Sequence, residues 1–144
     1  MSILDLLKTG ITTGSAAQTR ALAAELAAAL PPDPTLALHG DMGVGKTTFV
    51  QGLAQGLGVR EHVTSPTFAI YSVYQGNPRK LIHLDAYRLE QEAQIEPLLL
   101  DEFLVSPYVL AVEWPEKTGA WLPKDAWHLT LSIVEGDKHR VILR

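Results

Sequence analysis

The chain has 144 residues, of which 47% are hydrophobic and 19% are charged, and this composition predicts one globular domain spanning residues 1–144. Its formal net charge of −4 argues against autonomous binding of a nucleic acid, because a protein that grips a polyanion by itself normally carries a basic surface. The absence of cysteine excludes disulfides, cysteine metal ligands and cysteine nucleophiles.

The N-terminal residues contain neither the basic segment nor the apolar run of a signal peptide. The most apolar stretch, residues 21–30, carries Glu25 and is too short to span a bilayer. We therefore expect a cytoplasmic protein that makes no contact with a membrane.

Apolar patterns and turn residues in the first half of the chain predict two helices around a strand. An Ala- and Leu-rich helix is expected from its N-cap, Ser15, to Leu30, because a proline-rich segment follows it. The short apolar run Thr35–His39 predicts a buried strand. The next helix is expected to begin within a glycine-rich segment and to end near Leu57, where Gly58 is a natural stop.

The second half of the chain predicts two hairpins, a helix and one further buried strand. Because strands alternate with helices in the middle and hairpins flank them, we expect an α/β three-layer sandwich with a mixed central β-sheet. The expected elements are a hairpin of residues 68–74 with Lys80–Asp85, a helix over 89–104 that Pro97 kinks or splits, the strand Tyr108–Glu113, and a hairpin of Trp127–Ile133 with His139–Leu143.

Residues 40–47 fit the pattern G-x-x-x-x-G-K-[ST] between an expected strand and an expected helix, which predicts a phosphate-binding loop. Glycines let backbone N–H groups fold around an anion, and a helix N-terminus adds partial positive charge. In this loop Lys46 is placed to reach the β- and γ-phosphates, Thr47 to coordinate Mg²⁺, and Thr48 to hydrogen-bond the α-phosphate. The flanking elements and the paired threonines outweigh the alternative, a turn with a solvated lysine. The sequence therefore predicts a site for ATP and Mg²⁺ whose binding residues are Asp41, Met42, Gly43, Val44, Gly45, Lys46, Thr47 and Thr48.

Two carboxylates, Asp85 and Glu113, each follow an expected strand. Ligands of open α/β sheets gather at the carboxyl ends of strands, so both side chains are candidates to face the loop. We expect one to contact Mg²⁺ and the other to activate or position water, and the pattern leaves open which does which. The alternative is that Asp85 and Glu113 are ordinary solvated carboxylates at strand ends, with no role in a site. Asp41 lies inside the loop and is expected to point outward.

Ser65 and Thr67 precede the expected strand of residues 68–74 on either side of a proline. Two interpretations are equally supported. In one, both side chains belong to a switch that senses the γ-phosphate. In the other, the segment is an ordinary turn that opens the strand.

Four segments of the sequence stand in a characteristic order and spacing: GDMGVGKTT (40–48), SPTF (65–68), HLDAYRL (83–89) and VEWPE (112–116). Together they resemble the TsaE family, formerly YjeE, which consists of small bacterial ATPases that act in tRNA threonylcarbamoyladenosine (t⁶A) synthesis. The phosphate-binding loop is shared by many families, but the other three segments are far more specific. The resemblance extends from about Ser15 to Trp127.

The resemblance implies a P-loop NTPase with weak, partner-stimulated ATP hydrolysis. Its partners would be homologues of TsaD and TsaB, which transfer a threonylcarbamoyl group to adenosine 37 of tRNA, so that tRNA is reached only through them. By matching position, Lys46 and Thr47 would bind phosphate and Mg²⁺, and Glu113 would be the likelier metal ligand. Asp85 would be the catalytic carboxylate, acting with Lys46 and with Thr67 of the switch, and Trp114 would lie close to the nucleotide or the partner surface. His83 also matches the family, but a histidine within a strand is more often structural, and we assign it no catalytic role.

Three other functions are open alternatives. A small-molecule kinase needs a lid that excludes water, and no insertion large enough for one follows Asp85, although Arg88 is present. A GTPase is disfavoured because the N-K-x-D pattern is absent and residues 85–88 lack the glycine of D-x-x-G. An interaction module that binds nucleotide only for stability would show no partner-stimulated hydrolysis.

Overall fold

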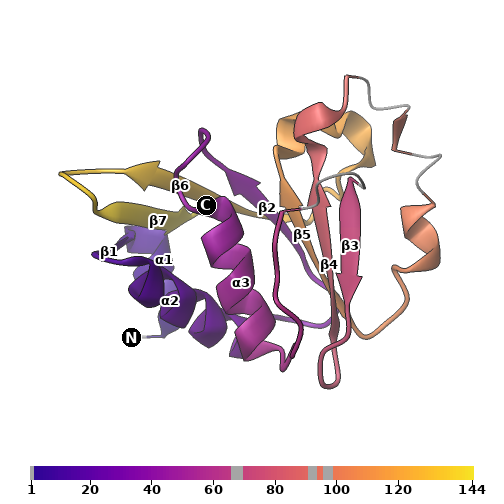
Figure 1. Ribbon diagram of the computed structural model, residues 1–144, viewed down its shortest axis with the longest axis horizontal. Helices are drawn as coiled ribbons and strands as arrows, with labels where there is room; N and C mark the ends of the chain where they lie inside the picture. Colours follow the sequence, from indigo (N-terminus) through magenta and orange to yellow (C-terminus); the bar gives the residue numbers. More distant parts are fainter. Residues whose placement is uncertain (1, 66–69, 91–93, 96–98) are drawn as a thin grey trace.

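The computed structural model describes residues 2–65, 70–90, 94–95 and 99–144. This part of the chain folds into one mixed sheet of seven strands with three α-helices (Figure 1). The α-helices are α1 (Ile3–Thr9), α2 (Ala16–Ala28) and α3 (Lys46–Gly56). The strands are β1 (Ile11–Thr13), β2 (Thr35–His39), β3 (Tyr71–Tyr74), β4 (Lys80–Asp85), β5 (Tyr108–Glu113), β6 (Trp127–Ile133) and β7 (His139–Leu143).

The strand order is β1-β7-β6-β2-β5-β4-β3. The four central strands β6, β2, β5 and β4 run parallel, whereas β3 and β7 pair antiparallel with their neighbours, as does β1 with β7. The prediction of a mixed sheet with a hairpin on either side is confirmed. The carboxyl ends of the four parallel strands consequently lie at one edge of the sheet.

The helix boundaries follow from the residues that flank them. The Ser15 side chain accepts a hydrogen bond from the Gln18 N–H and caps α2, as predicted. Helix α3 ends at its C-cap, Leu57, and Gly58 follows with φ +79°. A positive φ is readily adopted by glycine, which has no Cβ, so Gly58 is the predicted stop.

Two expectations differ from the structure. The short elements α1 and β1 were not predicted. The helix expected over residues 89–104, kinked or split at Pro97, is wrong for the part of this segment that the structure describes, which contains no α-helix. Leu89 has an extended backbone (φ −71°, ψ 128°) after the 3₁₀ turn η1 (Ala86–Arg88), and Leu99 is left-handed (φ +56°) before the turn η4 (Leu100–Glu102). The apolar spacing of this segment reflects burial of Leu89, Ile95 and Leu100 against the sheet, which short turns achieve without a helix. Residues 91–93 and 96–98, Pro97 among them, lie outside the described residues, as do 68 and 69 of the predicted strand that contains β3.

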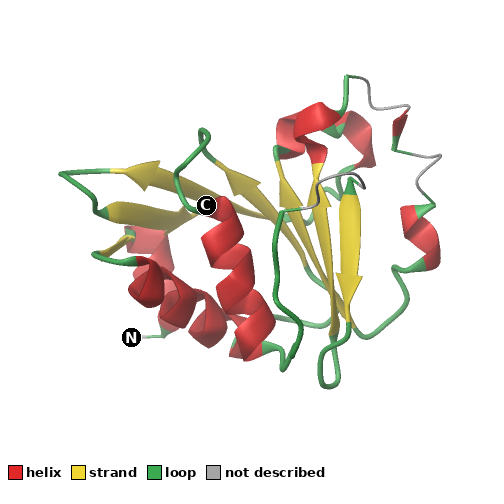
Figure 2. Ribbon diagram, in the orientation of Figure 1, coloured by secondary structure: helices red, strands yellow, loops and turns green. Residues whose placement is uncertain are grey.

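Each face of the sheet carries its own apolar core. All three α-helices cover one face (Figure 2), where Leu26, Phe49 and Leu53 pack against strand side chains such as Leu38. On the opposite face, 3₁₀ turns and loops cover β4 and β5. The predicted third layer is therefore not α-helical in the described residues. None of the helices described is long and apolar enough to cross a membrane.

Helices α2 and α3 approach each other closely at Gly52. A Cβ on this residue would lie 2.6 Å from the Arg20 Cα and 2.7 Å from the Ala23 Cβ. Gly52→Ala therefore forces the helices apart, and we expect it to lower the free energy of unfolding by about 2 kcal/mol, despite the better helix propensity of alanine. Urea unfolding measures the change, and Gln55→Ala on the exposed side of α3 is the control, expected to stay within about 0.5 kcal/mol of the wild type. Equal stability of Gly52→Ala and the control would show that the contact is not tight.

Candidate functional site

The loop between β2 and α3 has the backbone conformation of an anion cradle. Gly40, Gly43 and Gly45 have φ values of +144°, +80° and +95°, which residues with a Cβ rarely adopt. Gly45 is the N-cap of α3, and among the described residues no side chain caps the first turn of this helix. Its N–H groups therefore point toward the position where a phosphate binds in loops of this kind.

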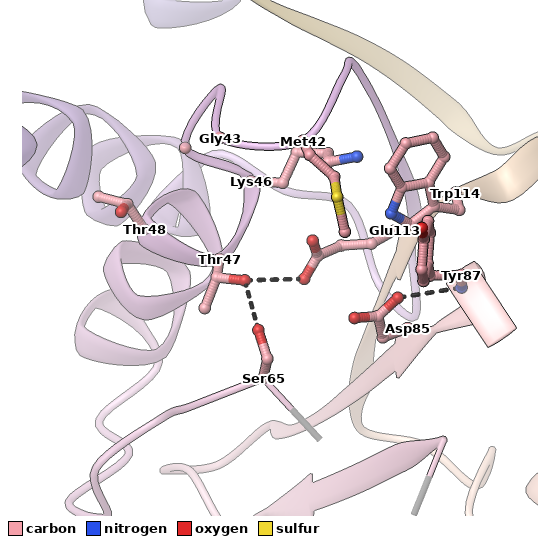
Figure 3. Close-up of a pocket in the computed structure, with 11 residues that line it drawn as sticks. Met42, Gly43, Lys46, Thr47, Thr48, Ser65, Asp85, Tyr87, Glu113 and Trp114 are labelled. Atoms are coloured by element: carbon pink, nitrogen blue, oxygen red, sulfur yellow. Dashed lines mark hydrogen bonds between the residues drawn. The ribbon is translucent and has the colours of Figure 1, made fainter. Parts of the chain in front are cut away.

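A cavity of about 500 Å³ opens beside this loop (Figure 3). It brings together residues from the loop, α3 and the ends of β4 and β5, as the sequence predicted for the carboxyl edge of the sheet. The lining residues are Met42, Gly43, Gly45, Lys46, Thr47, Thr48, Ser65, Asp85, Tyr87, Glu113 and Trp114.

Two of the predicted binding residues do not line the cavity. Asp41 is exposed, in agreement with the expectation that it points outward. The Val44 side chain is buried in the core on the helical face of the sheet, so only its backbone belongs to the loop. Thr67 lies outside the described residues, whereas Ser65, from the same segment, lies at the cavity wall.

Thr47, Ser65 and Glu113 form one hydrogen-bonded group. The Thr47 hydroxyl donates to Glu113 Oε2 at 3.2 Å and lies 2.9 Å from the Ser65 hydroxyl. The group thus clusters oxygen atoms at the first turn of α3. Thr48 points away from it (Figure 3).

Asp85 and Glu113 stand opposite each other at the ends of β4 and β5, in parallel register. Glu113 is only 4% exposed, and the structure places its carboxylate against Thr47. Asp85 is more accessible, and its Oδ1 accepts a hydrogen bond from the Tyr87 N–H at 3.1 Å, capping η1. The two carboxylates therefore lie in different environments, one buried and tied to Thr47, the other at the cavity rim.

Lys46 is 5% exposed, and its ammonium group is held at the cavity wall. Its Nζ donates to the Gly40 carbonyl and lies 3.6 Å from the centroid of the Trp114 ring, a cation–π contact. Burial lowers the pKa of Lys46, and the nearby carboxylates, Glu113 foremost, oppose that shift. Trp114 has a left-handed backbone (φ +58°), which turns the chain after β5 and directs the ring over Lys46.

Three contacts of the site were not predicted. Tyr87 lines the cavity, and its ring lies 5.2 Å from that of Trp114. His83 Nε2 lies 2.6 Å from Glu113 Oε2. His139 Nδ1 donates to the Val44 carbonyl at 2.8 Å and ties β7 to the loop. Tyr87 and His83 each lie two residues from Asp85 in the sequence, and this nearness to a predicted site residue was a signal that they reach the site. No local sequence pattern pointed to His139.

The chain resembles known proteins in both sequence and structure. The family model "Threonylcarbamoyl adenosine biosynthesis protein TsaE" matches residues 13–142. A Bacillus subtilis protein named tRNA threonylcarbamoyladenosine biosynthesis protein TsaE is 38% identical over 124 residues, covering 86% of this chain and 77% of the relative. A protein of the same name from Streptomyces coelicolor is 42% identical over 121 residues, covering 82% and 81%.

The crystal structure of Bacillus subtilis YdiB has the same fold, with a TM-score of 0.75 and 32% sequence identity over 92% of this chain and 81% of that one. The similarity in fold thus extends over 92% of this chain, and the family match spans residues 13–142, the range that contains the loop and the cavity-lining residues. The chain belongs to the TsaE family.

Proposed function

We propose that this protein is a P-loop NTPase that binds ATP with Mg²⁺ and hydrolyses it slowly, as an accessory protein of tRNA t⁶A synthesis in the cytoplasm. One observation carries the proposal. A single cavity joins the glycine-rich loop, Lys46 and Thr47 to Glu113 and Asp85, in a chain whose relatives are named for threonylcarbamoyladenosine biosynthesis.

The residues of the cavity fit Mg²⁺. Magnesium prefers oxygen ligands, and it is usually held by one or two protein groups together with substrate phosphates. The Thr47 hydroxyl and the Glu113 carboxylate lie 3.2 Å apart and offer such oxygens. Thr47 and Glu113 would hold the ion, and bound Mg²⁺ would neutralise negative charge on the phosphates.

The remaining residues take complementary roles. Lys46 binds the β- and γ-phosphates after its ammonium group leaves the Gly40 carbonyl, and the N–H groups of the loop surround their oxygens. Asp85, accessible at the rim, orients the attacking water as the catalytic carboxylate. Trp114 forms the wall beside the phosphates, and Thr67 is assigned to the switch on the family pattern alone.

Partners complete this function. TsaD and TsaB homologues would carry out the modification and hold the tRNA, because a chain with a net charge of −4 is poorly suited to grip a polyanion by itself. ATP hydrolysis would then reset the partner complex between turnovers.

Reconstitution tests this proposal directly. With TsaB, TsaD, a threonylcarbamoyl-adenylate source and tRNA, we expect several t⁶A products per TsaD only when this protein and ATP are both present. The Lys46→Ala variant is the negative control, because it removes the ammonium group of Lys46 from the cavity and should not replace the wild-type protein in this reaction. Product that accumulates equally without the protein would overturn the proposal, and transfer of phosphate from ATP to a metabolite would point to a kinase instead.

A further inference from the structure

We propose that His83 is a positioning residue, whose imidazole holds the Glu113 carboxylate in the orientation that serves as a metal ligand. The inference rests on the proposed function only in requiring that the cavity bind nucleotide with Mg²⁺. It assigns a role in the site to a histidine whose place within a strand suggested packing alone.

The geometry links three side chains from three separate elements. His83 of β4 is fully buried, and its Nε2 lies 2.6 Å from Glu113 Oε2. The same oxygen accepts a hydrogen bond from the Thr47 hydroxyl at 3.2 Å. One carboxylate oxygen is thus fixed from both sides, by a central strand of the sheet and by the first turn of α3.

The position of His83 in the sheet gives this contact its rigidity. It pairs in register with Ala111 of β5, so Glu113 lies two residues further along on the same face. Both strands are central and hydrogen-bonded over six residue pairs. The histidine therefore acts on Glu113 from a fixed backbone, whereas an exposed partner would be free to move.

The two ring nitrogens of His83 have different surroundings. Nδ1 is buried and finds no partner among the described residues. Nε2 makes the contact with Glu113. The hydrogen bond to Glu113 is therefore the polar contact that the structure shows for this buried ring.

A packing role and a positioning role predict different results. If His83 only fills space, its replacement lowers stability and affects nucleotide binding with and without Mg²⁺ alike. If it orients Glu113, the loss falls on the part of the affinity that depends on Mg²⁺. Loss of a hydrogen-bond partner behind a metal ligand typically costs 10- to 100-fold in metal affinity.

The experiment compares two variants of the full chain. His83→Leu is similar in size but lacks a donor, and His83→Gln supplies an amide N–H near the position of Nε2. We measure ADP affinity by calorimetry in Mg²⁺ and in EDTA, and take the ratio of the two. We expect His83→Leu to lower this ratio by about 10-fold while its affinity in EDTA stays within about two-fold, and His83→Gln to recover most of the ratio. In a Glu113→Gln background, His83→Leu should change the ratio no further.

A ratio unchanged in His83→Leu, or equal losses with and without Mg²⁺, would overturn the inference. Should His83→Leu not fold, nitrogen-15 NMR of the wild-type protein without nucleotide decides instead. We expect Glu113→Gln to shift the Nε2 resonance of His83, because the two side chains are in contact; a resonance that does not shift overturns the inference. A wild-type protein that binds ADP neither in Mg²⁺ nor in EDTA would count against the proposed function instead. The NMR measurement would still test the role of His83.

Discussion

Replacing Lys46 by alanine is expected to weaken ATP binding by about 100-fold while leaving the fold intact. A hydrogen bond to a charged group contributes up to about 3 kcal/mol, which corresponds to that factor in a dissociation constant. Lys46 is the lysine that lines the described cavity, and it stands between the loop carbonyl of Gly40 and the Trp114 ring. Its loss removes the cation that would meet the β- and γ-phosphates, and no other described lining residue carries a positive charge.

Calorimetric titration with MgATP measures this effect, and circular dichroism checks that the variant is folded. Lys124→Ala is the matched control, because this lysine is exposed and does not line the cavity. We expect the control to bind within about two-fold of the wild type, since surface charges contribute little. A Lys46→Ala variant that binds as well as the control would refute the assignment of Lys46 to the phosphates.

The elements predicted from sequence are those that local residues determine. Ser15 caps α2 and Gly58 ends α3, and both signals operate within one turn of the helix. The missed strand β1 depends on a partner far away in sequence, because Ile11 pairs with Val141. Three residues carry too short a pattern to reveal such a strand. Its existence is a property of the folded sheet.

The site shows the same division. The loop and its lysine are contiguous, so the pattern of residues 40–47 identified them, and the carboxylates were recognised by their place after a strand. What the local residues could not predict is which carboxylate contacts Thr47; only the family resemblance favoured Glu113. Asp85 and Glu113 are equivalent in local sequence, and only the packing of α3 against the sheet brings Glu113 to Thr47. The hydrogen bond from His83 to Glu113 joins neighbouring strands and likewise depends on their register.

Replacing Asp85 is expected to separate turnover from binding. In Asp85→Asn we expect ATP affinity within about three-fold of the wild type, because the hydrogen bonds and the cation that hold the phosphates remain. Partner-stimulated phosphate release should fall by about 100-fold, the typical contribution of a positioned general base. Asparagine keeps a side-chain oxygen that can accept from the Tyr87 N–H, so η1 stays capped and only the charge is lost.

Comparison with Asp85→Ala distinguishes the cap from the charge. Alanine removes both, so additional loss of stability in Asp85→Ala measures the cap, while equal turnover in the two variants assigns the catalytic effect to the carboxylate. Asp137→Asn in the exposed β6–β7 turn controls for the change in net charge. Phosphate release in the presence of TsaD and TsaB homologues, measured beside calorimetric ATP binding, gives both quantities. If Asp85→Asn lost binding as severely as Lys46→Ala, Asp85 would have to hold the nucleotide or its metal, and the division of roles between Asp85 and Glu113 would be reversed.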